Sequence, residues 1–101
     1  MRELRAKAPV LHERLPLLRL VLFGSYALGR QTPASDIDLL VVYSGEQRPD
    51  AYRLVRETFD LRGLEPHIYS DSEASAMRDT VERMAEDGLE IEYGRRVKSE
   101  E

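Results

Sequence analysis

The sequence predicts an α/β domain in which a short mixed sheet of about four strands is packed with helices. Two observations favour this class. Segments with apolar side chains at helical spacing alternate along the chain with short apolar runs bounded by glycine or proline. The length of 101 residues suits a single hydrophobic core. We therefore expect one domain over residues 1–101, with a charged, flexible tail from residue 95.

The chain is expected to begin with a helix followed by a buried strand. Residues 2–15 read as an amphipathic helix that ends before Pro16, because apolar side chains recur at helical spacing. These side chains are Leu4, Ala8, Leu11 and Leu15. Residues 18–23 form an apolar run typical of a buried strand, and Gly24 ends it.

The next segment is expected to lead into the centre of the sheet. Ser25 can cap a short helix over residues 25–30, and residues 31–35 read as a loop. Residues 36–43 predict a second strand. Because both of its faces are apolar beyond Asp38, this strand is expected to lie centrally.

A helix and an edge strand are expected next. Pro49 suits the first position of a helix with one apolar face, and Gly63 is expected to terminate it. Residues 64–70 predict a third strand. Pro66 has no N–H to donate to a neighbouring strand, which favours a position at the edge of the sheet.

The last predicted elements are one longer helix and one brief strand. Ser70 and Glu73 fit a capping box, which would open a helix that ends at Gly88. Its expected buried stripe consists of Ala74, Met77, Val81, Met84 and Ala85. Residues 89–93 alternate apolar and acidic side chains, which is typical of a strand.

Composition narrows the classes of function. The chain contains no cysteine, which excludes disulfides, thiolate metal sites and a catalytic thiol. Its net charge is −4, so direct binding of nucleic acid is not expected. No apolar run approaches the roughly 20 residues of a membrane span. We therefore expect a cytoplasmic protein without membrane contact. An open edge at the third or last strand is compatible with a homo-oligomer.

The segment from Leu22 to Leu40 brings together residue types that suit phosphate chemistry. A glycine directly after a strand, Gly24, lets the backbone approach a phosphate, and Ser25 adds a hydroxyl beside free amides. Asp36 and Asp38 are two residues apart on a strand, so both carboxylates leave the same face. Such oxygen ligands favour Mg²⁺ or Mn²⁺. The pattern predicts metal-assisted phosphoryl or nucleotidyl transfer.

These residues resemble a known family. The pattern is similar to the signature of the polymerase-β-like nucleotidyltransferases. It consists of Gly24-Ser25, then ten residues, then Asp36-x-Asp38. Length and element order look like the minimal nucleotidyltransferases, the smallest members. The resemblance implies the nucleotidyltransferase fold. It also implies that Gly24 and Ser25 hold the triphosphate of ATP, that Asp36 and Asp38 bind the metal pair, and that Arg30 can neutralise phosphate charge.

The sequence departs from this family at the third carboxylate. The resemblance implies an aspartate on the strand over residues 64–70, where it helps to bind metal and to deprotonate the incoming hydroxyl. When Ile68 and the helix cap that follows it are aligned with the family pattern, His67 falls at the position of that aspartate. Glu65 lies two residues earlier, on the same face of the strand. Either side chain can serve as the base. Alternatively neither does, and the site binds nucleotide and metal without efficient transfer.

Two hypotheses about function follow from the resemblance. In the first, the chain is a Mg²⁺-dependent enzyme that transfers AMP from ATP to a hydroxyl of a partner protein. The resemblance implies an all-helical HEPN-type toxin as that partner, with this chain as its antitoxin. In the second, the transfer site has decayed, and the chain neutralises the HEPN-type protein by contact.

Overall fold

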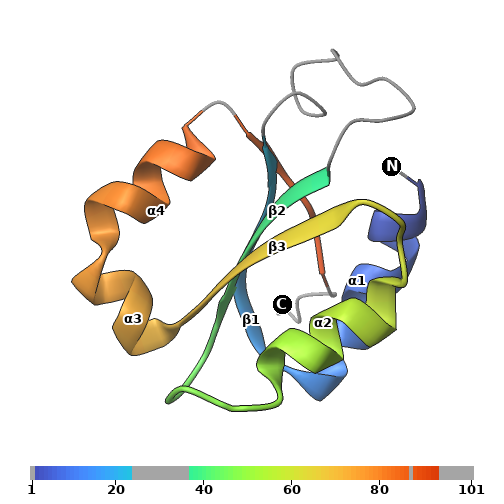
Figure 1. The fold of residues 1–101 in the computed structure, drawn as a ribbon, viewed down its shortest axis with the longest axis horizontal. Helices are drawn as coiled ribbons and strands as arrows, with labels where there is room; N and C mark the ends of the chain where they lie inside the picture. The colour runs from blue at the N-terminus through green and yellow to red at the C-terminus, as the bar shows by residue number, and fades with distance from the viewer. Residues whose placement is uncertain (1, 24–36, 87, 94–101) are drawn as a thin grey trace, which may run out of the picture.

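The structure is a computed structural model that describes residues 2–23, 37–86 and 88–93 (Figure 1). Its elements are α1 (Arg2–Arg14), β1 (Leu17–Phe23), β2 (Ile37–Tyr43), α2 (Ala51–Phe59), β3 (Leu64–Ser70), α3 (Asp71–Ala76), α4 (Arg78–Ala85) and β4 (Leu89–Glu90). This mixed α+β arrangement confirms the predicted fold class. The short helix predicted over residues 25–30, the loop over 31–35 and the tail from residue 95 lie outside the described residues.

The four strands form one mixed sheet with the order β3-β2-β1-β4. β1 is antiparallel to both β2 and β4, whereas β2 and β3 run parallel. The predicted central position of β2 is confirmed, and six of its seven residues are buried; Asp38 is the partly exposed one. The predicted edge position of β3 is confirmed as well. Pro66 is tolerated there because an edge strand needs only one row of ladder hydrogen bonds.

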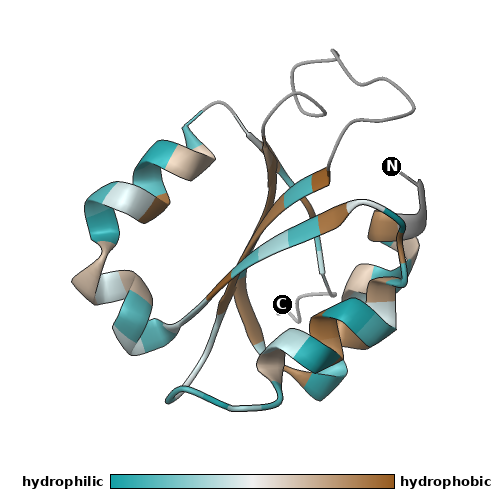
Figure 2. Ribbon diagram, viewed as in Figure 1, coloured by the Kyte–Doolittle hydropathy of each residue, from teal (hydrophilic) through white to brown (hydrophobic). Residues whose placement is uncertain are grey.

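One face of the sheet is covered by α1 and α2, and it holds the larger part of the core. The spacing predicted for α1 is confirmed, because Leu4, Ala8, Leu11 and Leu15 are all fully buried. They pack with inward-facing leucines of β1 and β2 and with Val55 and Phe59 of α2. β1 and β2 are predominantly hydrophobic in Figure 2, whereas α3 and α4 have mostly hydrophilic residues.

The opposite face of the sheet is covered by α3 and α4 (Figure 1), and here one expectation was wrong. The capping box is present: Glu73 N–H donates to Ser70 Oγ over 3.2 Å, and Ser70 N–H donates to Glu73 Oε1 over 2.9 Å. The single helix predicted up to Gly88 is broken at Met77, whose φ is −114° and ψ 38°. Met77 is 46% exposed and does not belong to the buried stripe, whereas Val81 is buried.

The break has a physical reason in the sparse apolar content of this segment. No residue of α3 is buried; its capping box ties it to the end of β3, and Ala74 packs against the smaller apolar cluster. α4 packs instead through Val81, Met84 and Ala85. The bend at Met77 thus separates a helix without buried residues from one that packs against the sheet.

Two further boundaries differ from the sequence prediction. α2 ends at Phe59 rather than near Gly63, because Asp60 adopts a left-handed conformation with φ 49° and ψ 49°. Asp is among the few residues apart from Gly that adopt this conformation readily. β4 is shorter than the predicted strand over residues 89–93, although Ile91 N–H still donates to the carbonyl of Leu20 over 2.8 Å.

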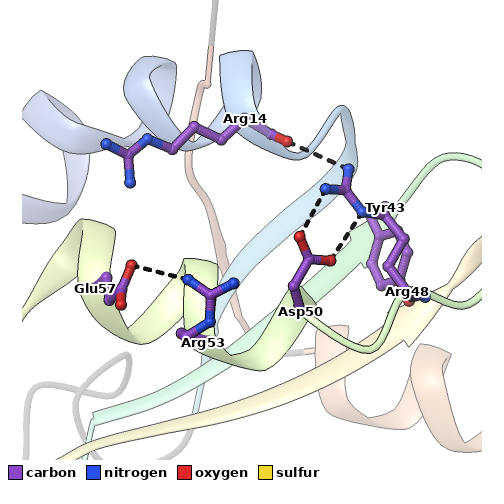
Figure 3. Close-up of polar contacts among 6 residues, drawn as sticks. All are labelled: Arg14, Tyr43, Arg48, Asp50, Arg53 and Glu57. Carbon is purple, nitrogen blue, oxygen red and sulfur yellow. Dashed lines mark hydrogen bonds and ion pairs between the residues drawn. The ribbon is translucent and has the colours of Figure 1, made fainter.

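Arg48 fastens the connection between β2 and α2 to the end of α1 (Figure 3). Its guanidinium forms a two-pronged pair with Asp50, Nε to Oδ1 at 3.1 Å and Nη2 to Oδ2 at 3.0 Å. Nη1 donates to the carbonyl of Arg14 over 3.3 Å. The backbone N–H of Arg48 donates to the hydroxyl of Tyr43 over 2.8 Å. The hydrogen bonds from Arg48 hold the pKa of the Asp50 carboxyl below its usual value.

Within the described part of the chain, no helix has the length and apolar character needed to cross a membrane.

Candidate functional site

The structure describes three of the seven residues that the sequence suggested for the site. Asp38 lies on β2, and Glu65 and His67 lie on β3. The other four fall outside the described residues, and they are Gly24, Ser25, Arg30 and Asp36.

Asp38 is the second residue of β2, and it lies on the sheet face that α3 and α4 cover. Strand alternation places it on the same face as Leu40 and Val42, which pack with Val81 of α4. Those two residues are buried, whereas the side chain of Asp38 is 30% exposed. The carboxylate therefore projects from the end of a buried row toward solvent.

The register of the sheet places two further side chains beside Asp38. Phe23 of β1 and Glu65 of β3 are its partners on the two neighbouring strands. Side chains of partner residues leave the same face of a sheet. Phe23, Asp38 and Glu65 thus form one row across three strands at the end where β2 begins. Glu65 is exposed and Phe23 is partly buried.

His67 belongs to the next row, as the partner of Leu40, but its ring reaches back toward Asp38. The distance from His67 Nε2 to Asp38 Oδ1 is 3.6 Å. The imidazole also lies against Phe23, with ring centroids 5.2 Å apart and an angle of 58° between the planes. Its side chain is 39% exposed. The structure therefore brings Asp38 and His67 together and holds the imidazole between an aromatic ring and a carboxylate.

This arrangement has defined chemical capacities. A gap of 3.6 Å is longer than a hydrogen bond, so the contact with His67 does not occupy Asp38 Oδ1. A neutral imidazole can accept a proton or coordinate a metal ion. Carboxylate oxygens are the usual ligands of Mg²⁺ and Mn²⁺. Among the residues that the structure describes, no three His, Asp or Glu side chains converge on one point. Asp38 and His67 supply two donors, and the donor types suit a divalent ion.

The sequence did not single out Phe23 as a site residue. Its position as the last residue of β1, directly before Gly24, was the available signal. Its contact with His67 depends on the alignment of β1, β2 and β3, which no local pattern reveals. An open depression of about 300 Å³ lies elsewhere, at the bend between α3 and α4, and residues 75–80 line it. It contains none of the candidate site residues.

Comparison with known proteins places the chain in a family. The sequence model of the nucleotidyltransferase domain matches residues 4–92, a range that includes all seven candidate site residues. The fold is similar to a crystal structure described as a putative nucleotidyltransferase from Sulfolobus solfataricus. That similarity has a TM-score of 0.58 and 21% sequence identity, and it covers 88% of this chain and 76% of the other. No curated protein sequence matches the chain. On the extent of the domain match, this chain belongs to the nucleotidyltransferase domain family.

Proposed function

We propose that this chain transfers AMP from ATP to a hydroxyl of a partner protein, using a divalent ion, Mg²⁺ or Mn²⁺. Membership of the nucleotidyltransferase domain family supports the reaction class. The observation that supports this site is the approach of His67 Nε2 to Asp38 Oδ1, at 3.6 Å, beside Glu65 on the same sheet face. A carboxylate that can hold metal thus lies next to two groups that can accept a proton.

In this proposal the chain's residues divide the work into three roles. The backbone at Gly24 and the hydroxyl of Ser25 bind the phosphates, and Arg30 neutralises part of their charge. Asp36 and Asp38 hold the metal. A bound divalent ion would neutralise the phosphates and stabilise both the attacking and the leaving oxygen.

The transfer balances without any further reactant. The hydroxyl oxygen of the acceptor forms a bond to the α-phosphorus of ATP, and the bond from that phosphorus to the bridging oxygen of the β-phosphate breaks. Pyrophosphate leaves, and the proton of the hydroxyl passes to Glu65 or His67. Both side chains are solvent-accessible and lie beside Asp38, so both can reach an acceptor bound there.

We further propose that the acceptor lies on an all-helical HEPN-type toxin, with this chain as the antitoxin. The support is the resemblance to the minimal nucleotidyltransferases. In this small domain, the apolar side chains of both clusters pack the sheet against its helices, which leaves little room for an acceptor site within the chain. A separate protein is therefore the natural source of the acceptor hydroxyl.

A second function is favoured by one observation. The register partner of Asp38 is Glu65, and His67 lies 3.6 Å from the Asp38 carboxylate, at the position where the resemblance implies an aspartate. A chain that lost the third carboxylate could retain a partner-binding role without transfer. In that case the chain neutralises the HEPN-type protein by contact alone.

Amide NMR of the isolated chain tests the nucleotide site without knowledge of the partner. Titration with Mg²⁺ and ATP is expected to shift the amides of Gly24, Ser25, Asp38 and His67. The shifts should disappear in Asp36→Asn and persist in Asp79→Asn, an exposed carboxylate on α4. Absence of shifts at millimolar ATP would contradict a nucleotide site and favour the contact-only function.

The intact mass of a co-expressed HEPN-type partner separates the two functions. An added AMP that depends on Asp38 supports transfer. Neutralisation that survives Asp38→Asn, in a complex of unmodified mass, supports the contact-only module. Asp79→Asn again serves as the matched control, because it also removes an aspartate carboxylate but lies on α4, outside the Asp36-x-Asp38 motif.

A further inference from the structure

The gap between Asp38 and His67 is only slightly wider than the separation between two ligands of one metal ion. Nε2 and Oδ1 are 3.6 Å apart, and both side chains are partly open to solvent. Oxygen and nitrogen ligands about 2.1 Å from one ion, at angles between octahedral and tetrahedral, lie roughly 3.0–3.4 Å apart. A shift of a few tenths of an ångström in two partly exposed side chains would bring both atoms into that range.

Packing on one side restricts the orientation of the imidazole. The ring lies against Phe23 with centroids 5.2 Å apart, and the strand register sets its backbone beside fully buried Leu40. The ring nitrogen Nε2 faces the carboxylate at 3.6 Å. Neighbours that hold a ligand in place before the ion arrives are typical of metal sites in proteins.

The other histidine shows what a structural imidazole looks like in this chain. His12 Nδ1 accepts a hydrogen bond from the backbone N–H of Leu17 over 2.9 Å. Its ring packs against Tyr93 with centroids 4.9 Å apart. His12 thereby links the end of α1 to the start of β1. His67 Nε2 has a carboxylate in front of it at a distance too long for a hydrogen bond.

We propose that His67 Nε2 is a direct ligand of the divalent ion, together with the Asp38 carboxylate, and that the site therefore favours Mn²⁺ over Mg²⁺. This inference rests on the proposed metal-dependent transfer and deepens it. Mg²⁺ is a hard cation that prefers oxygen ligands, whereas first-row transition ions accept imidazole. A set of one nitrogen and one oxygen ligand therefore favours Mn²⁺ over Mg²⁺. With His67 occupied as a ligand, Glu65 is left to accept the proton of the acceptor hydroxyl.

Electron spin echo spectroscopy of bound Mn²⁺ tests the inference directly. The full chain is loaded with Mn²⁺ and α,β-methylene-ATP, which cannot undergo transfer. Nitrogen modulation from a coordinated imidazole is expected in the wild type, lost in His67→Asn and retained in His12→Asn. Calorimetric titration gives the affinities. The preference for Mn²⁺ over Mg²⁺ is expected to fall by at least about tenfold in His67→Asp, which restores an oxygen ligand.

The possible results separate the inference from the function on which it rests. Bound Mn²⁺ without nitrogen modulation, or with modulation unchanged in His67→Asn, overturns the assignment of His67 and leaves metal-dependent transfer standing. Failure to bind either ion with α,β-methylene-ATP overturns both. Circular dichroism of each variant checks the fold. If His67→Asn fails to fold, His67→Asp provides the same comparison, because loss of the modulation there has the same meaning.

Discussion

Asp38 and Glu65 are register partners on the parallel strands β2 and β3, so two carboxylates leave the same sheet face side by side. Neighbouring strands lie about 4.8 Å apart. Like charges directly opposite each other on neighbouring strands destabilise a sheet. Nothing in the packing of the strands requires either carboxylate, because both are at least partly exposed. The pair is therefore better explained by a function than by stability.

Replacing Glu65 separates these two effects. Glu65→Gln keeps the size of an exposed side chain but removes the charge and the ability to accept a proton. We expect the metal-free chain to gain up to about 1 kcal/mol in free energy of unfolding. We expect the rate of AMP transfer to fall by about 10²-fold or more, since a general base contributes that much. Denaturant titration and pyrophosphate release measure the two quantities.

Glu92→Gln is the matched control, because Glu92 is also exposed and lies after β4. It should change neither quantity. A Glu65→Gln variant that transfers AMP at the wild-type rate would remove Glu65 from the reaction.

Met77 gives a second prediction, on stability. Because Met77 is 46% exposed, Met77→Ala is expected to change the free energy of unfolding by less than about 0.5 kcal/mol. A methionine buried in a core would cost about 2–5 kcal/mol. Val81→Ala on the next helix is the contrasting variant. Val81 is 3% exposed, and the loss of two methyl groups should cost about 1–2 kcal/mol. Equal and large costs for both variants would contradict the bend at Met77.

Met77 also shows where prediction from sequence reached its limit. The first three strands and α1 were predicted to within about a residue because their patterns are local: apolar side chains on both faces of β2, and the spacing from Leu4 to Leu15. The helix predicted up to Gly88 has helical spacing throughout, so the spacing gives no sign of the break at Met77. Similarly, the end of α2 depends on Asp60 taking a left-handed conformation, which Asp permits but does not require.

In the candidate site, too, local patterns were predictable from the sequence and contacts between distant segments were not. Period-two alternation was enough to place Glu65 and His67 on one face of β3. The approach of His67 to Asp38 depends on the pairing of Leu40 with His67, which joins segments far apart in the chain. The contact with Phe23 adds a third strand. Such distances follow from register, and register is set by the packing of the whole sheet.

Asp50 predicts a specific dependence of stability on pH. Hydrogen bonds from Arg48 lower the pKa of Asp50 below 3.8 in the folded chain. A carboxyl with a lowered folded pKa stabilises the fold fully above its unfolded pKa, and this contribution is lost as the pH falls through the folded value. We therefore expect unfolding to become easier as the pH drops below about 3.8. In Asp50→Asn this part of the acid sensitivity should be absent.

Urea titrations of both proteins between neutral pH and pH 2 measure the difference. The side chains of Arg48 and Asp50 are partly exposed. The difference in acid sensitivity between the wild type and Asp50→Asn should therefore shrink as salt is added. Asp79→Asn, which removes an exposed carboxylate from α4, should keep the full acid sensitivity. Identical pH profiles for the wild type and Asp50→Asn would contradict the role of the Arg48 pair.

The edge of β3 gives a prediction on self-association. The backbone groups of alternate residues point away from β2, and three of these positions are protected. The carbonyl of Leu64 accepts a hydrogen bond from Arg56 Nη1 over 2.7 Å, and Ser70 N–H donates to Glu73. Pro66, between them, has no N–H. Edges blunted in this way resist pairing with another strand. The open edge that the sequence suggested as a route to a homo-oligomer is therefore partly closed.

Removing the protection should create a self-associating chain. In the double variant Arg56→Ala, Pro66→Val, the carbonyl of Leu64 is freed and residue 66 gains an outward N–H on a β-branched residue. We expect its sedimentation coefficient to rise with concentration over a range in which that of the wild type stays constant. Arg53→Ala is the matched control, because Arg53 lies on the same helix and pairs with Glu57 at 3.5 Å. A double variant that sediments like Arg53→Ala would show that Arg56 and Pro66 do not guard this edge. A wild-type dimer joined through β3 would overturn the prediction outright, since the strand would then pair despite its blocked positions.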